Sequence, residues 1–116
     1  MTIQRLHSNP RLSGAVTFGD LVFLSGQVPG EATEVGGQTR EVLAKIDALL
    51  AEAGSDKDHL LSATIYLKNV GEDFAAMNEV WSAWLSPGQA PSRTTVQAEL
   101  ARPQVLVEIT VIAVRL

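Results

Sequence analysis

The feature that most constrains the fold is an apolar run near the C-terminal end of the chain, residues 105–114, with the sequence VLVEITVIAV. A run of Val, Ile and Leu is typical of a β-strand, in which successive side chains point to opposite faces of the sheet. Both sets are apolar here, with Val105, Val107, Ile109 and Val111 alternating with Leu106, Ile112 and Val114. We therefore expect a sheet that is covered on both faces, because exposed apolar patches of that size are rare on monomers.

Two stretches with helical periodicity can cover one face of this sheet. Apolar side chains recur every three or four residues in 35–50, which predicts an amphipathic helix that stops before Gly54. A second helix is predicted between a cap at Glu72 or Asp73 and the Pro87-Gly88 pair. Its apolar positions, which we interpret as core, are Phe74, Met77, Trp81 and Trp84. The other face of the sheet then needs a partner chain, which predicts a homo-oligomer.

The remaining apolar segments predict strands. Residues 15–25 are typical of two strands around a Gly-Asp turn, and residues 61–68 alternate apolar and polar side chains. Residues 93–100 and 105–114 are predicted as two strands joined by a turn, and we expect them to pair as neighbours. These elements predict one α+β domain over residues 1–116, with the two helices packed on one face of the sheet.

Composition excludes several classes of function. There is no cysteine, so disulfides and thiolate chemistry are excluded, and His7 and His59 lack the clustered carboxylates of a metal site. A net charge of −4 without a Lys/Arg cluster argues against a nucleic-acid partner. Gly36-Gly37 lacks the Lys and Ser or Thr of a phosphate loop. With no apolar run long enough to span a membrane and no secretory signal, we expect a cytoplasmic protein without membrane or metal partners.

Arg93 and Glu108 are the first candidates for chemistry. In the hairpin register that places Arg93 opposite Glu108, the two side chains share one face of the sheet. Charged groups in apolar β-structure are costly to desolvate, so they either pair with each other or serve a ligand. The sequence leaves both interpretations open.

Three smaller residues are weaker candidates. Ser25 and Gly26 follow a predicted strand, where a small hydroxyl and an unhindered backbone admit a ligand closely. Ser25 has no His partner in the sequence pattern and no GxSxG motif, so it gives little support for a nucleophile. Asn78 is offset from the apolar stripe of the second helix, and surface exposure is its simplest interpretation.

The C-terminal third carries a resemblance to a known family. APSRTTVQAEL (residues 90–100) followed by VLVEITVIAV resembles the signature of the Rid/YjgF family, in which Ala-Pro-x-Arg opens one strand and Val-Glu-Ile occupies the next. The resemblance continues through the hairpin FGDLVFLSGQVP, the strand LLSATIYLKNV and both predicted helices, so it covers nearly the whole chain. Its most specific parts are the spacing from Arg93 to Glu108 and the Ser-Gly-Gln that ends the hairpin.

This resemblance implies a chorismate-mutase-like α+β subunit with a mixed sheet, assembled as a homotrimer with ligand pockets between subunits. It implies that Arg93 binds a substrate carboxylate and that Glu108 holds or activates water. The residues implied to line the pocket with Arg93 are Ser25, Gly26, Asn78 and Thr95. Enzymatic members hydrolyse enamines and imines such as 2-aminoacrylate and 2-iminopropanoate, products of pyridoxal-phosphate enzymes, to 2-keto acids and ammonia without a cofactor.

The chain departs from the archetype of that family at several positions. It has Leu12 where the archetype has Tyr, Thr95 where it has Cys, and Ala101-Arg102-Pro103 where it has Leu-Pro. These differences bear on the substrate and the rate, and they leave Arg93 and Glu108 in place. Two other functions stay open: a non-catalytic protein that binds small carboxylates in the same pocket, and the ribonuclease or translation-inhibitor activity ascribed to some relatives, which the acidic balance disfavours.

Overall fold

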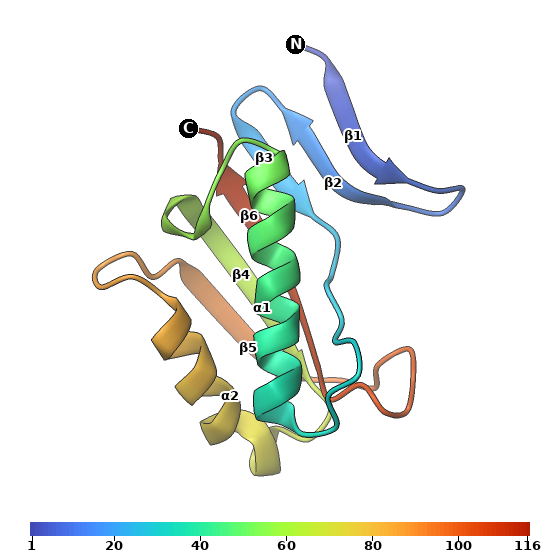
Figure 1. The fold of residues 1–116 in the computed structure, drawn as a ribbon, viewed down its shortest axis with the longest axis vertical. Coiled ribbons are helices and arrows are strands. Elements are labelled where there is room, and N and C mark those ends of the chain that lie inside the picture. The colour runs from blue at the N-terminus through green and yellow to red at the C-terminus, as the bar shows by residue number, and fades with distance from the viewer.

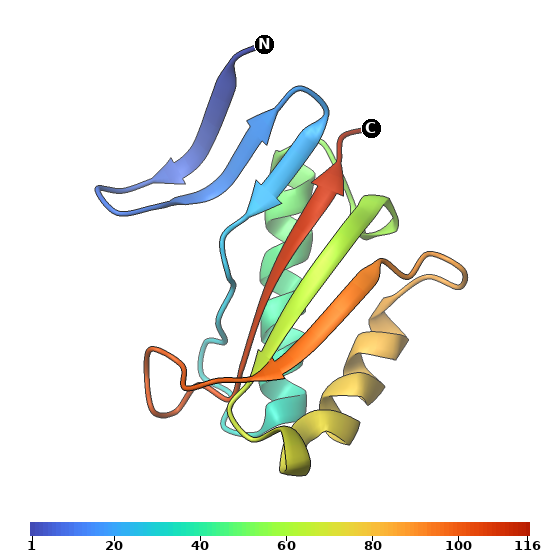
Figure 2. The ribbon, with the colours of Figure 1, turned by 180° about the vertical axis from the view of Figure 1, so that it is seen from behind.

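The computed structural model of the protein describes residues 1–116. Its elements follow the order β1 (Ile3–Ser8), β2 (Ser13–Phe18), β3 (Leu21–Leu24), α1 (Val35–Glu52), a short 3-10 helix η1 (Lys57–His59), β4 (Leu60–Leu67), α2 (Val70–Trp84), β5 (Ser92–Gln97) and β6 (Val107–Val114). The strands form one sheet in the order β1-β2-β3-β6-β4-β5 (Figures 1 and 2). Only β4 and β5 run parallel, so the sheet is mixed.

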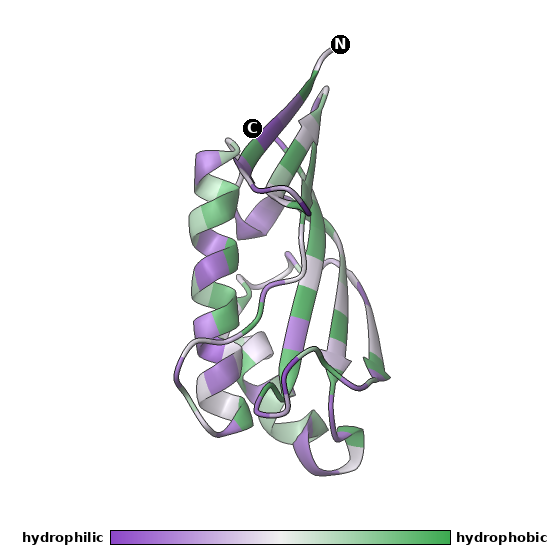
Figure 3. Ribbon diagram, turned by 90° about the vertical axis from the view of Figure 1, so that its right-hand side faces the viewer, coloured by the Kyte–Doolittle hydropathy of each residue, from purple (hydrophilic) through white to green (hydrophobic).

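Both helices pack on the same face of the sheet, as predicted, and Figure 3 shows the helical layer and the sheet side by side. Alternation along the strands explains this, because every second residue of β4 and β6 is buried against the helices. Val107, Ile109 and Val111 of β6 pack there with the apolar stripe of α1. The fold is therefore the predicted α+β class. Neither helix is long and apolar enough to cross a membrane.

The prediction that the last two strands pair as neighbours is wrong. β4 lies between β5 and β6, pairing parallel with β5 and antiparallel with β6 (Figure 2). The reason is the connection: α2 joins β4 to β5, and a helical crossover places two consecutive strands side by side in parallel. The chain then passes through residues 98–106 to the other side of β4, where β6 completes the sheet.

One strand and the start of one helix also differ from the sequence predictions. β1 was not predicted, because its residues are largely exposed and polar and so carry no alternation of apolar and polar side chains. Helix α2 begins one turn earlier than expected, after Asn69, so Glu72 and Asp73 lie inside its first turn rather than capping it. Acidic side chains are favourable in that position because they face the positive end of the helix dipole.

The side chain of Gln38 in α1 forms hydrogen bonds with the loop before α1 and with the segment that leads into β6. Its side chain is almost fully buried in the first turns of α1. The amide nitrogen donates to the carbonyl oxygens of Ala32 (3.0 Å) and Gln104 (2.9 Å), and the amide oxygen accepts from the N–H of Leu106 at 2.8 Å. The loop before α1 and the segment leading into β6 are thus held together by one polar side chain whose hydrogen-bonding groups are satisfied.

The sheet face away from the helices, which we call the open face, carries large apolar side chains that remain exposed. They include Phe18, Leu21, Phe23 and Val96, each between 37% and 44% accessible. The pairings Phe18–Leu21 and Phe23–Ile112 place the first three on neighbouring strands, whereas Val96 lies on β5 at the other edge of the sheet. An apolar surface built from several adjacent strands matches the two-sided apolar pattern of β6 and marks this face as a candidate protein interface.

Candidate ligand-binding site

Arg93 lies in β5 with its side chain on the helix-covered face, because its Cα pairs with that of buried Ala63. Its Nη1 donates a 2.6 Å hydrogen bond to Oδ1 of Asn78. The guanidinium carbon lies 5.8 Å from the ring centroid of Phe74 and 5.8 Å from that of Trp81. Phe74, Asn78 and Trp81 are four and three residues apart, so a single face of α2 surrounds Arg93.

No carboxylate neutralises Arg93. The carboxylate contacts made by basic side chains in the structure are His7–Glu52 and His59–Asp56, both at 2.6 Å between exposed side chains, and neither involves Arg93. Burial lowers the pKa of Arg93 from its ordinary value, because removal from water penalises the charged form. The guanidinium nevertheless remains protonated near neutral pH. A partly buried cation without an anion is costly, and this favours a role for Arg93 in binding an anionic ligand.

Glu108 lies on the open face. Its neighbours Val107 and Ile109 are buried towards the helices, and its Cα pairs with that of Tyr66 in β4. A hollow of about 390 Å³ opens beside it, lined by Gly26, Tyr66, Ala98, Glu99, Leu100, Glu108 and Thr110. Gly26 leaves room for the Glu108 carboxylate in this position, because a Cβ at residue 26 would collide with Oε2 of Glu108 and displace it.

The predicted cross-strand pair of Arg93 and Glu108 is therefore wrong. Arg93 pairs with Ala63, whereas Glu108 pairs with Tyr66, three residues further along β4 and on its opposite face. Regular strand spacings put the two Cα atoms roughly 14 Å apart. The hairpin register assumed that β5 and β6 were adjacent, and the insertion of β4 both separates the side chains and places them on different faces.

The other candidate residues divide between the two locations. Thr95 lies two positions after Arg93 on the same face, and its Oγ1 is buried without a hydrogen-bond partner. Asn78 is half-buried and contacts Arg93, so the surface interpretation of Asn78 is incomplete. Ser25 precedes Gly26, but its Oγ donates a 2.5 Å hydrogen bond to the carbonyl oxygen of Ser13. One half of the site thus contains Arg93, Asn78 and Thr95, and the other contains Glu108 and Gly26.

Sequence reasoning missed several residues beside these two halves. Phe74 and Trp81 were interpreted only as core, although their spacing from Asn78 already placed all three on one side of a helix. Tyr66 was predicted on the polar side of its strand, which is the side that faces the hollow. Leu100 and Glu99 lie in the connection after β5, and no periodic signal could place them there.

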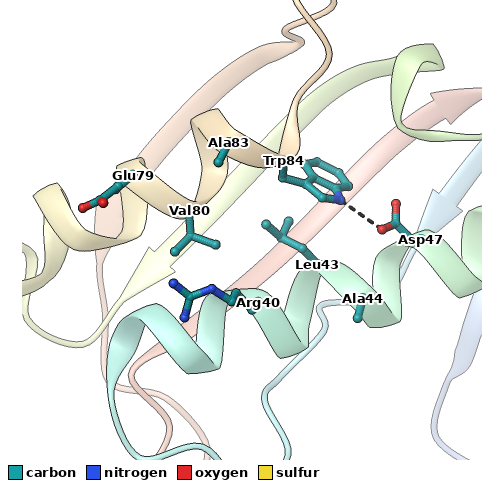
Figure 4. Close-up of a pocket in the computed structure, with 8 residues that line it drawn as sticks. All are labelled: Arg40, Leu43, Ala44, Asp47, Glu79, Val80, Ala83 and Trp84. Carbon is teal, nitrogen blue, oxygen red and sulfur yellow. Dashed lines mark hydrogen bonds between the residues drawn. The ribbon is translucent and has the colours of Figure 1, made fainter.

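A second hollow, of about 350 Å³, lies between the two helices and contains none of the candidate residues (Figure 4). Leu43 and Val80 line it, and Trp84 closes one end by donating a 3.0 Å hydrogen bond from Nε1 to Oδ2 of Asp47. This contact joins α2 to α1. We interpret the second hollow as a groove of helix packing.

The architecture defines the class of the protein: an α+β domain with a six-stranded mixed sheet, two helices on one face and an open apolar face on the other. Comparison with known proteins makes this specific. Residues 2–115 match the family described as Endoribonuclease L-PSP. A RutC family protein of Haemophilus influenzae is 44% identical over 115 residues, which cover 97% of this chain and 98% of that protein.

Solved structures agree with this match. A member of the YjgF protein family from Neisseria meningitidis is 49% identical, superposes with a TM-score of 0.98 and covers 100% of this chain and 97% of its own. A protein of unknown function of the Rid family from Yersinia pestis is 31% identical, with a TM-score of 0.86 and coverage of 92% and 90%. The chain belongs to the YjgF/Rid family, which confirms the resemblance read from its sequence.

Proposed function

We propose that the protein is a cofactor-independent hydrolase that deaminates small enamines and imines, of the 2-aminoacrylate and 2-iminopropanoate type, to 2-keto acids and ammonia. Membership of the Rid family supports this reaction class. The observation that carries the proposal is the partly buried guanidinium of Arg93, which no carboxylate neutralises. A planar carboxylate can accept two parallel hydrogen bonds from such a group, which fixes the orientation of a small substrate.

The chemistry requires few groups. The enamine 2-aminoacrylate first tautomerises to the imine, as its methylene carbon gains a proton and its nitrogen loses one. A water oxygen then adds to the electrophilic imine carbon while one water proton passes to a base and then to the imine nitrogen. The resulting carbinolamine forms the keto acid by releasing ammonia, as its hydroxyl proton passes to the departing nitrogen. Glu108 is the proposed base, because its carboxylate lines a hollow large enough for a small molecule and can hold the attacking water. Arg93 supplies position, and Thr95 and Asn78 line the carboxylate end.

The proposed active site is shared between copies of the chain. Arg93 and Glu108 lie on opposite faces of the sheet, so one small molecule cannot contact both within a single chain. The exposed apolar side chains of the open face provide a surface on which a second copy can pack. In a homotrimer, each of three equivalent interfaces would join Arg93 of one copy to Glu108 of the next.

The decisive experiment generates 2-aminoacrylate with a serine dehydratase and follows release of pyruvate with and without the protein. We expect pyruvate to form faster in its presence, and not with Arg93→Ala. A protein that binds pyruvate but leaves the rate unchanged would instead be a carboxylate-binding regulator.

The matched family is named for a ribonuclease, so a labelled RNA is incubated with the protein in parallel. The acidic net charge of −4 disfavours cleavage of that RNA.

A further inference from the structure

The partners that hold Arg93 are unusual because none of them is charged. A guanidinium presents five N–H donors along its edges, and one of them is used by Oδ1 of Asn78. The aromatic rings of Phe74 and Trp81 also lie beside it, and both ring centroids are 5.8 Å from the guanidinium carbon. This distance lies within the range in which a cation is attracted to the face of an aromatic ring.

Because the partners of Arg93 are uncharged, a substrate carboxylate can bind the guanidinium without displacing an internal carboxylate. An internal Asp or Glu would offset the desolvation of Arg93, but a substrate carboxylate would then have to displace it. Aromatic rings stabilise the cation without occupying its hydrogen-bonding edge. They also restrict the rotamers of a long side chain, which lowers the entropy cost when a ligand orders that side chain.

Packing in the hydrophobic core accounts for an aromatic side chain at position 81 but not at position 74. Trp81 is 4% exposed and also belongs to the core, whereas Phe74 is 42% exposed. Burial therefore gives little reason for an aromatic residue at position 74, while its contact with Arg93 does. Trp84, the third aromatic residue of α2, packs against Trp81 with the ring centroids 5.5 Å apart and donates a hydrogen bond to Asp47, so it supports Trp81 and does not contact Arg93 itself.

We propose that Phe74 and Trp81 are positioning residues, which hold the guanidinium of Arg93 by cation–π contacts and keep its edge free for the planar carboxylate of a substrate. The inference rests on the proposed role of Arg93. It adds that the specificity for carboxylates depends on an aromatic pair on α2.

Phe74→Leu tests the inference, because an exposed position tolerates this change without loss of the core. Calorimetric titration with pyruvate should show binding weakened roughly 3- to 10-fold, with an equal rise in KM and an unchanged kcat. Phe74→Tyr should restore wild-type affinity, since its ring keeps a similar face. Pyruvamide, which lacks the carboxylate, should show no difference between wild type and Phe74→Leu.

Wild-type affinity in Phe74→Leu, or an equal loss of affinity in Phe74→Tyr, would overturn the inference. So would unchanged pyruvate binding in Arg93→Ala, because the guanidinium would then not be the carboxylate site. If pyruvate binds through Arg93 and weakens in Phe74→Leu, yet no imine is hydrolysed, the proposed deaminase function fails while the aromatic positioning of Arg93 is supported.

Discussion

At the scale of single residues, Arg93 and Glu108 are both charged side chains within β-strands, but they face different surroundings. Arg93 lies among an amide and two aromatic rings on the helix-covered face. Glu108 lies over Gly26 at the edge of a hollow on the open face. Each side chain can therefore be tested separately, since neither holds the other in place.

Removal of the Arg93 side chain should eliminate carboxylate recognition. We expect Arg93→Ala to lower kcat/KM by roughly 100-fold or more, because two charge-assisted hydrogen bonds to the substrate are lost. Arg93→Lys should recover little activity, because an ammonium cannot reproduce the planar two-point contact. Steady-state kinetics with enzymatically generated 2-aminoacrylate gives the result, and circular dichroism checks that both variants are folded. Substantial activity in Arg93→Lys would show that the positive charge at position 93 is sufficient and that the planar two-point contact is not needed.

Glu108→Gln separates a chemical role from a supporting one. If Glu108 accepts the proton of water, this near-isosteric change should lower kcat by roughly 100-fold and leave pyruvate affinity unchanged. We expect this pattern, because no hydrogen bond or ion pair connects Glu108 to the proposed carboxylate site. An unchanged kcat with weaker pyruvate binding would assign Glu108 to substrate binding alone.

At the scale of elements, the unit β4-α2-β5 decides where the candidate residues meet. Helix α2 crosses over the strands it joins, so Asn78 and the two aromatic residues come to lie beside Arg93. The same crossover removes β5 from contact with β6. A hairpin prediction for the last two strands was reasonable from the short connection between them, but a local pattern cannot show that an earlier strand occupies the place between.

Two glycines, Gly54 after the end of α1 and Gly71 in the first turn of α2, offer a matched pair of substitutions. Gly54 has a φ of +86°, the left-handed conformation that ends the helix, whereas Gly71 lies in α2 with open space around it. Gly54→Ala should destabilise the protein by about 1 kcal/mol, because a Cβ is strained in that conformation. Gly71→Ala should stabilise it by about 0.5 kcal/mol, since alanine loses less entropy in a helix. Urea denaturation measures both, and shifts of the same sign would contradict the assignment.

At the scale of the whole molecule, the open face and the divided site lead to the same expectation of assembly. Sedimentation equilibrium at micromolar concentration should give about three times the 12.4 kDa of one chain. A stable monomer would remove the shared active site, because no single chain brings Arg93 to Glu108.

Mixed trimers test whether the site is shared. Arg93→Ala and Glu108→Gln are each expected to be inactive alone. When the two are unfolded together and refolded, an interface that pairs intact Arg93 of one chain with intact Glu108 of another should regain activity, at about a quarter of wild type for random mixing around a ring. Mixing the two variants without subunit exchange is the control. No recovery after refolding would show that Arg93 of one chain and Glu108 of another do not complete one active site.

The sequence by itself determined that both helices form and that the segments predicted at 15–25 and 61–68 are strands, because apolar periodicity and turn residues act over a few neighbouring positions. It also predicted that one face of the sheet is not covered by helices, and that Arg93 and Glu108 are charged residues within otherwise apolar β-strands. The tertiary structure alone decided that β4 separates β5 from β6, that Arg93 contacts Phe74, Asn78 and Trp81, and that Glu108 faces the other way. Strand order and cross-element contacts depend on how distant segments share one core, and no local pattern contains that information.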